Sequence, residues 1–91
     1  MGKRRRSIDV VAHILQSASG GSTRTGLMYA CGLSYKVTQE YVFLMFERGL
    51  LDYKPMEATY SPSEKGLQYL AIYEQMKILS DMIDLIKKEN Y

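Results

Sequence analysis

The stretch TRTGLMYACGLSYKVTQEYVFLMFERGLL, residues 23–51, decides the predicted fold. A helix capped by Ser22 or Thr23 is expected to end at Gly32, because glycine favours the left-handed backbone that closes a helix. Ser34 is expected to cap a second, longer helix. Two short helices joined by a tight turn form a helix-turn-helix, and the second helix of such a unit can lie in a DNA major groove.

Apolar spacing predicts which side of each helix is buried. The residues expected in the core are Leu27, Met28, Cys31, Val37, Tyr41, Leu44 and Met45. The residues expected outside on the second helix are Ser34, Tyr35, Lys36 and Gln39, with Glu40 and Phe43 beyond them. Lysine and glutamine side chains at this end can reach guanine and adenine edges, and the alternative is an ordinary solvated helix face.

Another helix is expected upstream, capped by Ser7 and ended by the loop at residues 19–22. Its predicted apolar face consists of Ile8, Val11, Ala12, Leu15 and Ala18. Residues 1–6 form a basic arm with the cations Lys3, Arg4, Arg5 and Arg6. Such an arm can enter a DNA minor groove, and a solubilising tail is an equally good interpretation.

A hairpin is expected downstream, with strands at 50–54 and 58–60 and a turn at 55–57. Its one basic side chain is Lys54. A long helix follows and runs to about Glu89, with either Ser61 or Ser63 as its N-cap. The hairpin would form the wing of the domain.

The long helix carries a heptad-like apolar seam, which predicts pairing with a second helix. The residues of this seam are Tyr69, Ile72, Met76, Leu79, Ile83 and Ile86. The positions beside it are poor in charge, which disfavours a parallel zipper and fits an antiparallel pair, or a pair that also packs on the globular part. We therefore expect a homodimer, because so apolar a helix is unstable alone in water.

Composition limits the chain to one ordinary globular domain of 91 residues with 46% hydrophobic side chains. Residues 1–36 carry six basic and one acidic side chain, whereas the remainder carries six basic and nine acidic ones. This asymmetry favours contact between one end and a polyanion, or else a solvated charged tail. We expect no secretory signal in the basic N-terminus and no membrane span, since no apolar run reaches the required length. The single cysteine suits a reducing cytosol.

The residue inventory does not predict an enzyme. His13 and Cys31 are the sole histidine and cysteine, too few for a tetrahedral metal site. Gly20 and Gly21 lack the lysine and hydroxyl of a phosphate-binding loop. We expect no cofactor and no small-molecule effector, and binding remains as the function.

Several short motifs resemble a known family of small archaeal winged-helix proteins. They are Thr25-x-Leu27-Met28-Tyr29, Leu33-Ser34-Tyr35, Tyr41, Gly49-Leu50-Leu51 and Tyr60-Ser61-Pro62-Ser63-Glu64-Lys65-Gly66. The family comprises ten-kilodalton DNA-binding proteins and one-domain regulators whose C-terminal helix forms an antiparallel coiled-coil dimer. The resemblance implies a winged helix-turn-helix, double-stranded DNA as partner, and a role in transcription control or chromatin organisation. Gly26 and Glu40 depart from the pattern, because such proteins often place basic or longer polar side chains there.

The expected fold is mainly α with a small β-hairpin: a basic arm at 1–6, a winged helix-turn-helix at 7–61 and a dimerisation helix at 62–91. The expected protein is a cytoplasmic, nucleoid-associated homodimer that binds DNA and regulates transcription. An architectural DNA binder with little sequence preference and a protein-binding module without DNA are the alternatives. The candidate DNA-binding residues are Lys3, Arg4, Arg5, Arg6, Arg24, Ser34, Tyr35, Lys36, Gln39 and Lys54.

Overall fold

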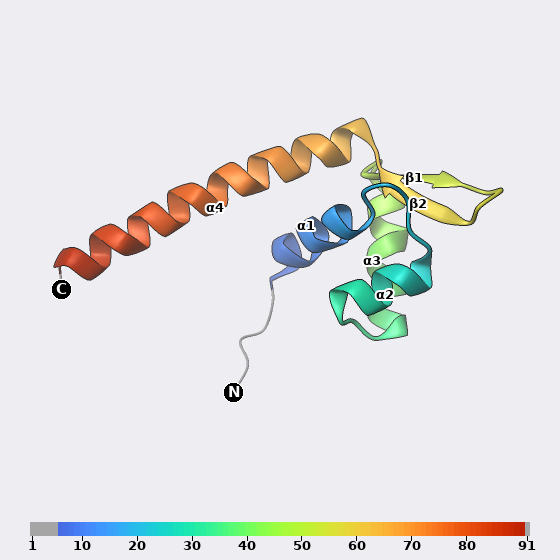
Figure 1. Ribbon diagram of the computed structural model, residues 1–91, viewed down its shortest axis with the longest axis horizontal. Coiled ribbons are helices and arrows are strands. Elements are labelled where there is room, and N and C mark those ends of the chain that lie inside the picture. Colours follow the sequence, from blue (N-terminus) through green and yellow to red (C-terminus); the bar gives the residue numbers. More distant parts are fainter. Residues whose placement is uncertain (1–5, 91) are drawn as a thin grey trace.

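The computed structural model describes the backbone of residues 6–90 and the side chains of residues 6–87. Its elements are α1 (Ser7–Ser17), α2 (Arg24–Cys31), α3 (Tyr35–Glu47), β1 (Leu51–Lys54), β2 (Thr59–Pro62) and α4 (Glu64–Asn90). Helices α1 to α3 and the hairpin gather at one end, and α4 extends away from them past α1 (Figure 1). The fold is a winged helix with a long C-terminal helix, as the sequence predicts.

The helix-turn-helix forms where local sequence signals place it. The Thr23 side chain accepts a hydrogen bond from the Gly26 amide at 3.0 Å and so caps α2. Gly32 closes α2 in the left-handed conformation, with φ at 63°. The Ser34 hydroxyl then accepts from the Val37 amide at 3.2 Å, which opens α3. The predicted caps of both helices are confirmed.

The predicted buried face of α3 is partly wrong. Thr38, Val42 and Met45 are the fully buried residues, whereas Leu44 is 45% exposed. Thr38 can be buried because its hydroxyl donates to the Ser34 carbonyl at 2.8 Å, so its polar group keeps a partner. The core face of α3 is therefore rotated from the predicted one.

Helix α1 is covered more widely than the sequence suggests. Val10 and Ile14 are buried, although neither belongs to the predicted face, and Ile8 and Val11 are half-buried. The reason is that α1 packs against both α2 and α4, so that two sides of the helix are covered. Its predicted start is one residue late, because Ser7 is the first helical residue and Arg6 occupies the cap position.

The second strand of the hairpin runs two residues further than predicted, and the first strand starts one residue later. β1 and β2 pair antiparallel with Leu51 opposite Pro62, so the chain is still in a strand at Ser61. Ser61 therefore does not cap α4. Ser63 does, because its hydroxyl accepts from the Gly66 amide at 3.0 Å. A further backbone bridge joins Ser22 to Tyr60 and ties the loop before α2 to the wing, a contact that the sequence analysis missed.

The first turn of α4 is fastened to the short link between α3 and β1. The Ser63 hydroxyl donates to the Gly49 carbonyl at 2.6 Å, and the Ser63 amide donates to the Leu50 carbonyl at 3.0 Å. At Gly66 the helix lies so close that an added Cβ would be 2.2 Å from the Leu50 carbonyl oxygen and 2.9 Å from Leu15 Cδ2. Glycine is thus required for this close approach.

Two tyrosines extend the attachment of α4 along α1. The Tyr69 hydroxyl donates to the Ile8 carbonyl at 3.0 Å, and the Tyr73 hydroxyl donates to the Asp9 carboxylate at 2.5 Å. The bond from Tyr73 is the largest cause that lowers the pKa of Asp9, and it raises the pKa of Tyr73 to about 12.

Among the described residues, no helix combines the length and the apolar character that a membrane span requires.

Candidate nucleic-acid interface

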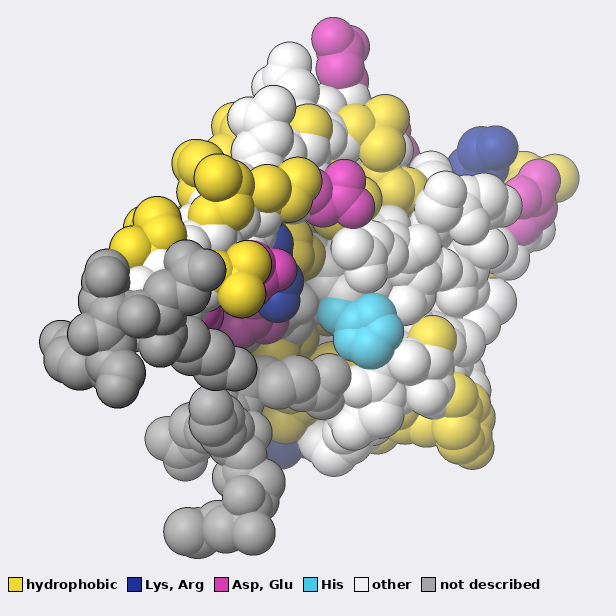
Figure 2. Space-filling model, turned by 60° about the vertical axis from the view of Figure 1, so that its left-hand side comes forward, with side chains coloured by type: hydrophobic (Ala, Val, Ile, Leu, Met, Phe, Trp, Pro, Cys, Tyr) yellow, Lys and Arg dark blue, Asp and Glu magenta, His cyan; other side chains and the backbone are white. Residues whose placement is uncertain are grey.

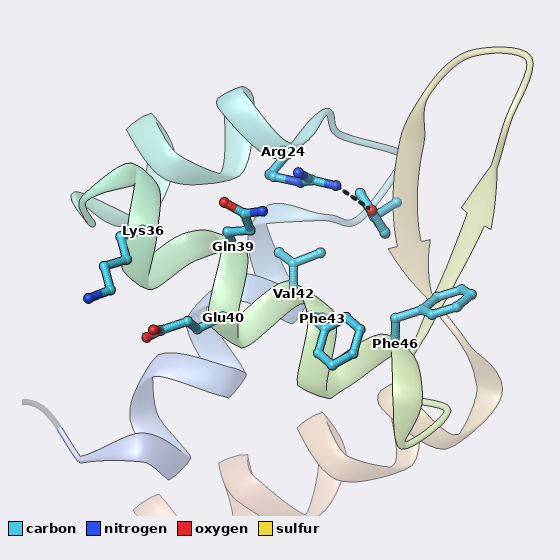
Figure 3. A pocket seen from close by; sticks show the side chains of 8 residues that line it. Arg24, Lys36, Gln39, Glu40, Val42, Phe43 and Phe46 are labelled. Atoms are coloured by element: carbon cyan, nitrogen blue, oxygen red, sulfur yellow. Dashed lines mark hydrogen bonds between the residues drawn. The ribbon is translucent and has the colours of Figure 1, made fainter.

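The outward face of α3 borders a groove of about 430 Å³ that lies between α3, the start of α2 and the hairpin. The residues that line the groove are Arg24, Lys36, Gln39, Glu40, Val42, Phe43, Phe46 and Tyr60. Figure 3 shows Arg24 on the α2 side, Gln39 and Val42 from α3 beneath it, and Phe46 toward the hairpin. Lys36 and Glu40 extend from the N-terminal half of α3. The groove therefore has a polar end and an aromatic end.

Arg24 is held at one wall of the groove by tyrosine hydroxyls. Its guanidinium donates to the Tyr60 hydroxyl at 3.3 Å, and this bond, followed by one to Tyr35, raises the pKa of Arg24. Its Nε is buried and has no partner among the described residues. Among the described residues no carboxylate forms an ion pair with Arg24. The tyrosines therefore orient the cation without neutralising its charge. Such a cation is suited to a phosphate.

A second, smaller hollow of about 270 Å³ lies on another side of Arg24, at the start of α2. It is lined by Thr23, Arg24, Thr25, Tyr35, Tyr53, Ala58 and Tyr60. Hydroxyls, a guanidinium and the positive end of a helix dipole surround this space, and all three favour an anion. In helix-turn-helix proteins the first helix of the unit crosses the DNA backbone, and this hollow lies at the start of the corresponding helix, α2.

The predicted DNA-binding residues have different surroundings. Lys36 and Gln39 are exposed and line the groove together, whereas Ser34 uses its hydroxyl as the α3 cap. Tyr35 is 54% exposed and lies beside Arg24. Lys54 is exposed at the end of β1, on the wing.

The basic arm contributes one described cation. Arg6 is exposed and forms an ion pair with Asp9, with Nε 3.5 Å from the carboxylate oxygen. Lys3, Arg4 and Arg5 lie outside the described residues. The arm therefore remains a sequence prediction.

The sequence analysis missed the aromatic part of the surface. Phe43 and Phe46 are 60% and 50% exposed and lie on the groove, but neither was a candidate site residue. A signal existed, because Lys36, Gln39, Phe43 and Phe46 follow the three- and four-residue spacing of one helix face. Tyr60 carried no comparable signal, because it reaches Arg24 from 36 residues away.

The predicted dimerisation residues divide into two groups. Tyr69 is half-buried and packs against α1 of its own chain. The others are exposed along α4: Ile72 at 67%, Met76 at 38%, Leu79 at 60%, Ile83 at 56% and Ile86 at 55%. Figure 2 brings the free end of α4 forward and shows hydrophobic side chains gathered over this helix.

Among the described residues no group of His, Cys, Asp and Glu side chains could hold a metal ion.

Comparison with known proteins identifies a family and a similar solved structure. The profile of a winged helix-turn-helix family matches residues 4–83. A crystal structure of Sso10a-2, a DNA-binding protein from Sulfolobus solfataricus, superposes with a TM-score of 0.79 and 25% sequence identity, covering 94% of each chain. A search of curated protein sequences finds no match.

Proposed function

The chain belongs to the winged helix-turn-helix family, and from this membership we propose that it binds double-stranded DNA as a homodimer and regulates transcription. The observation that carries the proposal is the Arg24 guanidinium, held by Tyr60 beside the exposed start of α3 and left without a carboxylate among the described residues. The structural relative Sso10a-2, itself a DNA-binding protein, supports the choice of DNA. The role needs no cofactor and implies residence with chromosomal DNA in the cytoplasm.

In the proposed complex α3 lies in the major groove. Lys36 and Gln39 contact base edges, since both are exposed on the outward face of α3. Arg24 and the start of α2 bind a phosphate of the adjoining strand. Lys54 brings the hairpin to the backbone, and the basic arm adds contacts in a minor groove.

The homodimer is proposed from the exposed apolar residues of α4. The side chains of Ile72, Leu79 and Ile83 are each more than half exposed, which is costly for a helix that remains unpaired. An antiparallel pair through these residues would bury them and place the two winged domains at opposite ends. Light scattering at micromolar concentration should give the mass of a dimer. A stable monomer would overturn this part of the proposal.

A second function, an architectural DNA binder with little sequence preference, is favoured by the hollow at the start of α2. Thr23, Arg24 and Thr25 line this hollow and suit a phosphate, which every DNA sequence offers. A salt titration with duplex DNA tests both functions, because log affinity falls by about 0.9 per phosphate contact for each unit of log salt. If no duplex binds at low salt, both fail and a protein-binding module remains.

Variants assign the contacts within that titration. Arg24→Ala should make the salt slope shallower by about 0.9 for each winged domain bound, and Lys77→Ala on α4 serves as the matched control. Replacing Lys36 and Gln39 together should reduce discrimination between sequences, whereas replacing Arg4 to Arg6 should weaken all sequences alike. The reverse pattern would show that the recognition surface is assigned to the wrong residues. Salt-steep binding that ignores sequence would favour the architectural function.

A further inference from the structure

The two phenylalanines of the chain both lie on the outward face of α3. Phe43 is 60% exposed and Phe46 is 50% exposed. Burying a phenylalanine side chain stabilises a protein, so leaving both of them half outside forgoes part of the available core. Leu44, on the same helix, lines a different hollow together with Tyr41 and Leu50. Phe43 and Phe46 therefore both lie on the groove side of α3, whereas Leu44 lies on another side of the helix.

Phe43 lies on the same helical face as the polar residues proposed to contact bases. Lys36 and Phe43 are two turns apart, which is about 10 Å along the axis, and Gln39 lies between them. The major groove of B-DNA is about 12 Å wide and 8.5 Å deep, so a helix lying in it can present all three side chains to base edges. Arg24, at the opposite wall, would bind the backbone at the same time.

The chemistry of this face selects a base. Thymine carries the single apolar group in the major groove, its 5-methyl, and aromatic side chains pack on it. Glu40, which also lines the groove, repels phosphate but can accept a hydrogen bond from a base amino group. An aromatic ring beside a carboxylate therefore fits base edges better than it fits the sugar–phosphate backbone.

We infer that Phe43 is a specificity-determining residue that favours thymine by packing on its 5-methyl group, with Phe46 beside it. This inference rests on the proposed function, because it requires α3 to lie in the major groove. It adds an apolar contact to an interface otherwise described by charge and hydrogen bonds.

Substituting uracil for thymine isolates the methyl group. The probes are a 20-base-pair duplex of alternating adenine and thymine and the same duplex with deoxyuridine in place of thymidine. Burying one methyl corresponds to about fourfold in affinity, so the full-length protein should bind the thymine duplex at least about fourfold more tightly. This ratio should stay constant between 50 and 200 mM salt while both affinities fall, since an apolar contact releases no counterions.

Variants connect the methyl group to one side chain. In Phe43→Ala the ratio should fall to about one, whereas Leu44→Ala, an exposed apolar residue outside the groove, should keep the wild-type ratio. Circular dichroism melting of each variant verifies folding. Equal binding of both duplexes by the wild-type protein overturns the inference and leaves the proposed function standing. A ratio that survives Phe43→Ala also overturns it, because duplex shape would then be responsible. Failure to bind any duplex overturns the proposed function itself.

Discussion

Replacing Gly66 with alanine should destabilise the protein, although helix propensity alone predicts the opposite. Alanine in place of glycine stabilises a helix interior by at most about 1 kcal/mol. In this structure the added Cβ would be 2.2 Å from the Leu50 carbonyl oxygen and 2.9 Å from Leu15 Cδ2. The nearest atom belongs to the backbone, so no side-chain rotation can relieve the contact.

The size of the effect follows from two costs. Overpacking a closely packed site costs about 1–3 kcal/mol, and contact with a backbone atom belongs at the upper end of this range. Moving the Leu50 carbonyl would also weaken its hydrogen bond from the Ser63 amide, worth about 1 kcal/mol. After the gain in propensity, the expected net loss is about 2–3 kcal/mol. That loss corresponds to a melting temperature lower by about 10–20 °C for a domain of this size.

Urea unfolding followed by circular dichroism, at one protein concentration, measures the effect. Gly26→Ala is the matched control, because it is also a helical glycine but its added Cβ would contact the side-chain hydroxyls of Ser22 and Thr23, at 2.7 and 3.2 Å. The Ser22 hydroxyl can rotate away, and the Thr23 hydroxyl needs to move by only a few tenths of an ångström, which keeps its cap of α2. The control should therefore stay within about 1 kcal/mol of the wild-type protein. If Gly66→Ala unfolds at the same urea concentration as the wild type or a higher one, the close approach of α4 to Leu50 is refuted.

Two further predictions concern α4. The bond between Tyr73 and Asp9 lowers the pKa of Asp9 and raises that of Tyr73 to about 12, so its contribution is present between their ordinary values of 3.8 and 10.0. This contribution is lost as the pH falls through the depressed pKa of Asp9, or as it rises from 10 through 12. In Tyr73→Phe the free energy of unfolding in urea should therefore depend less on pH at both the acidic and the basic end. A profile unchanged from the wild type would contradict the bond. Changing both Leu79 and Ile83 to glutamate should convert the proposed dimer to a monomer in sedimentation. The control Asp81→Lys, on the opposite side of α4, should remain a dimer. A dimer that survives the double change would place the interface elsewhere.

Local signals made the helix ends predictable. Thr23, Ser34 and Gly32 act through atoms within four residues of themselves, so their roles can be derived without knowing the rest of the fold. The buried side of α3 could not be derived in this way. Thr38 is buried because its hydroxyl finds the Ser34 carbonyl, and Leu44 is exposed because no described element covers it fully.

The candidate site shows the same division. Lys36 and Gln39 were predictable because helix periodicity places them outside, on the face that the groove uses. The state of Arg24 was not, since it depends on Tyr60, which the Ser22 backbone bridge holds in place. Phe43 was expected on the outer face but was not a candidate, because the candidate residues were those with a charge or a hydrogen-bonding group.

The attachment of α4 makes this helix a lever arm. It is fastened to the winged domain near its start, through Ser63, Gly66, Tyr69 and Tyr73, and its 27 residues extend over about 40 Å. About 25 Å of the helix lies beyond Tyr73, so a change of about 8° at that fastening would move the far end by about 3.5 Å, close to the rise of one base pair. In the proposed dimer, residues that never contact DNA would thus determine which spacing of two binding sites the protein can span.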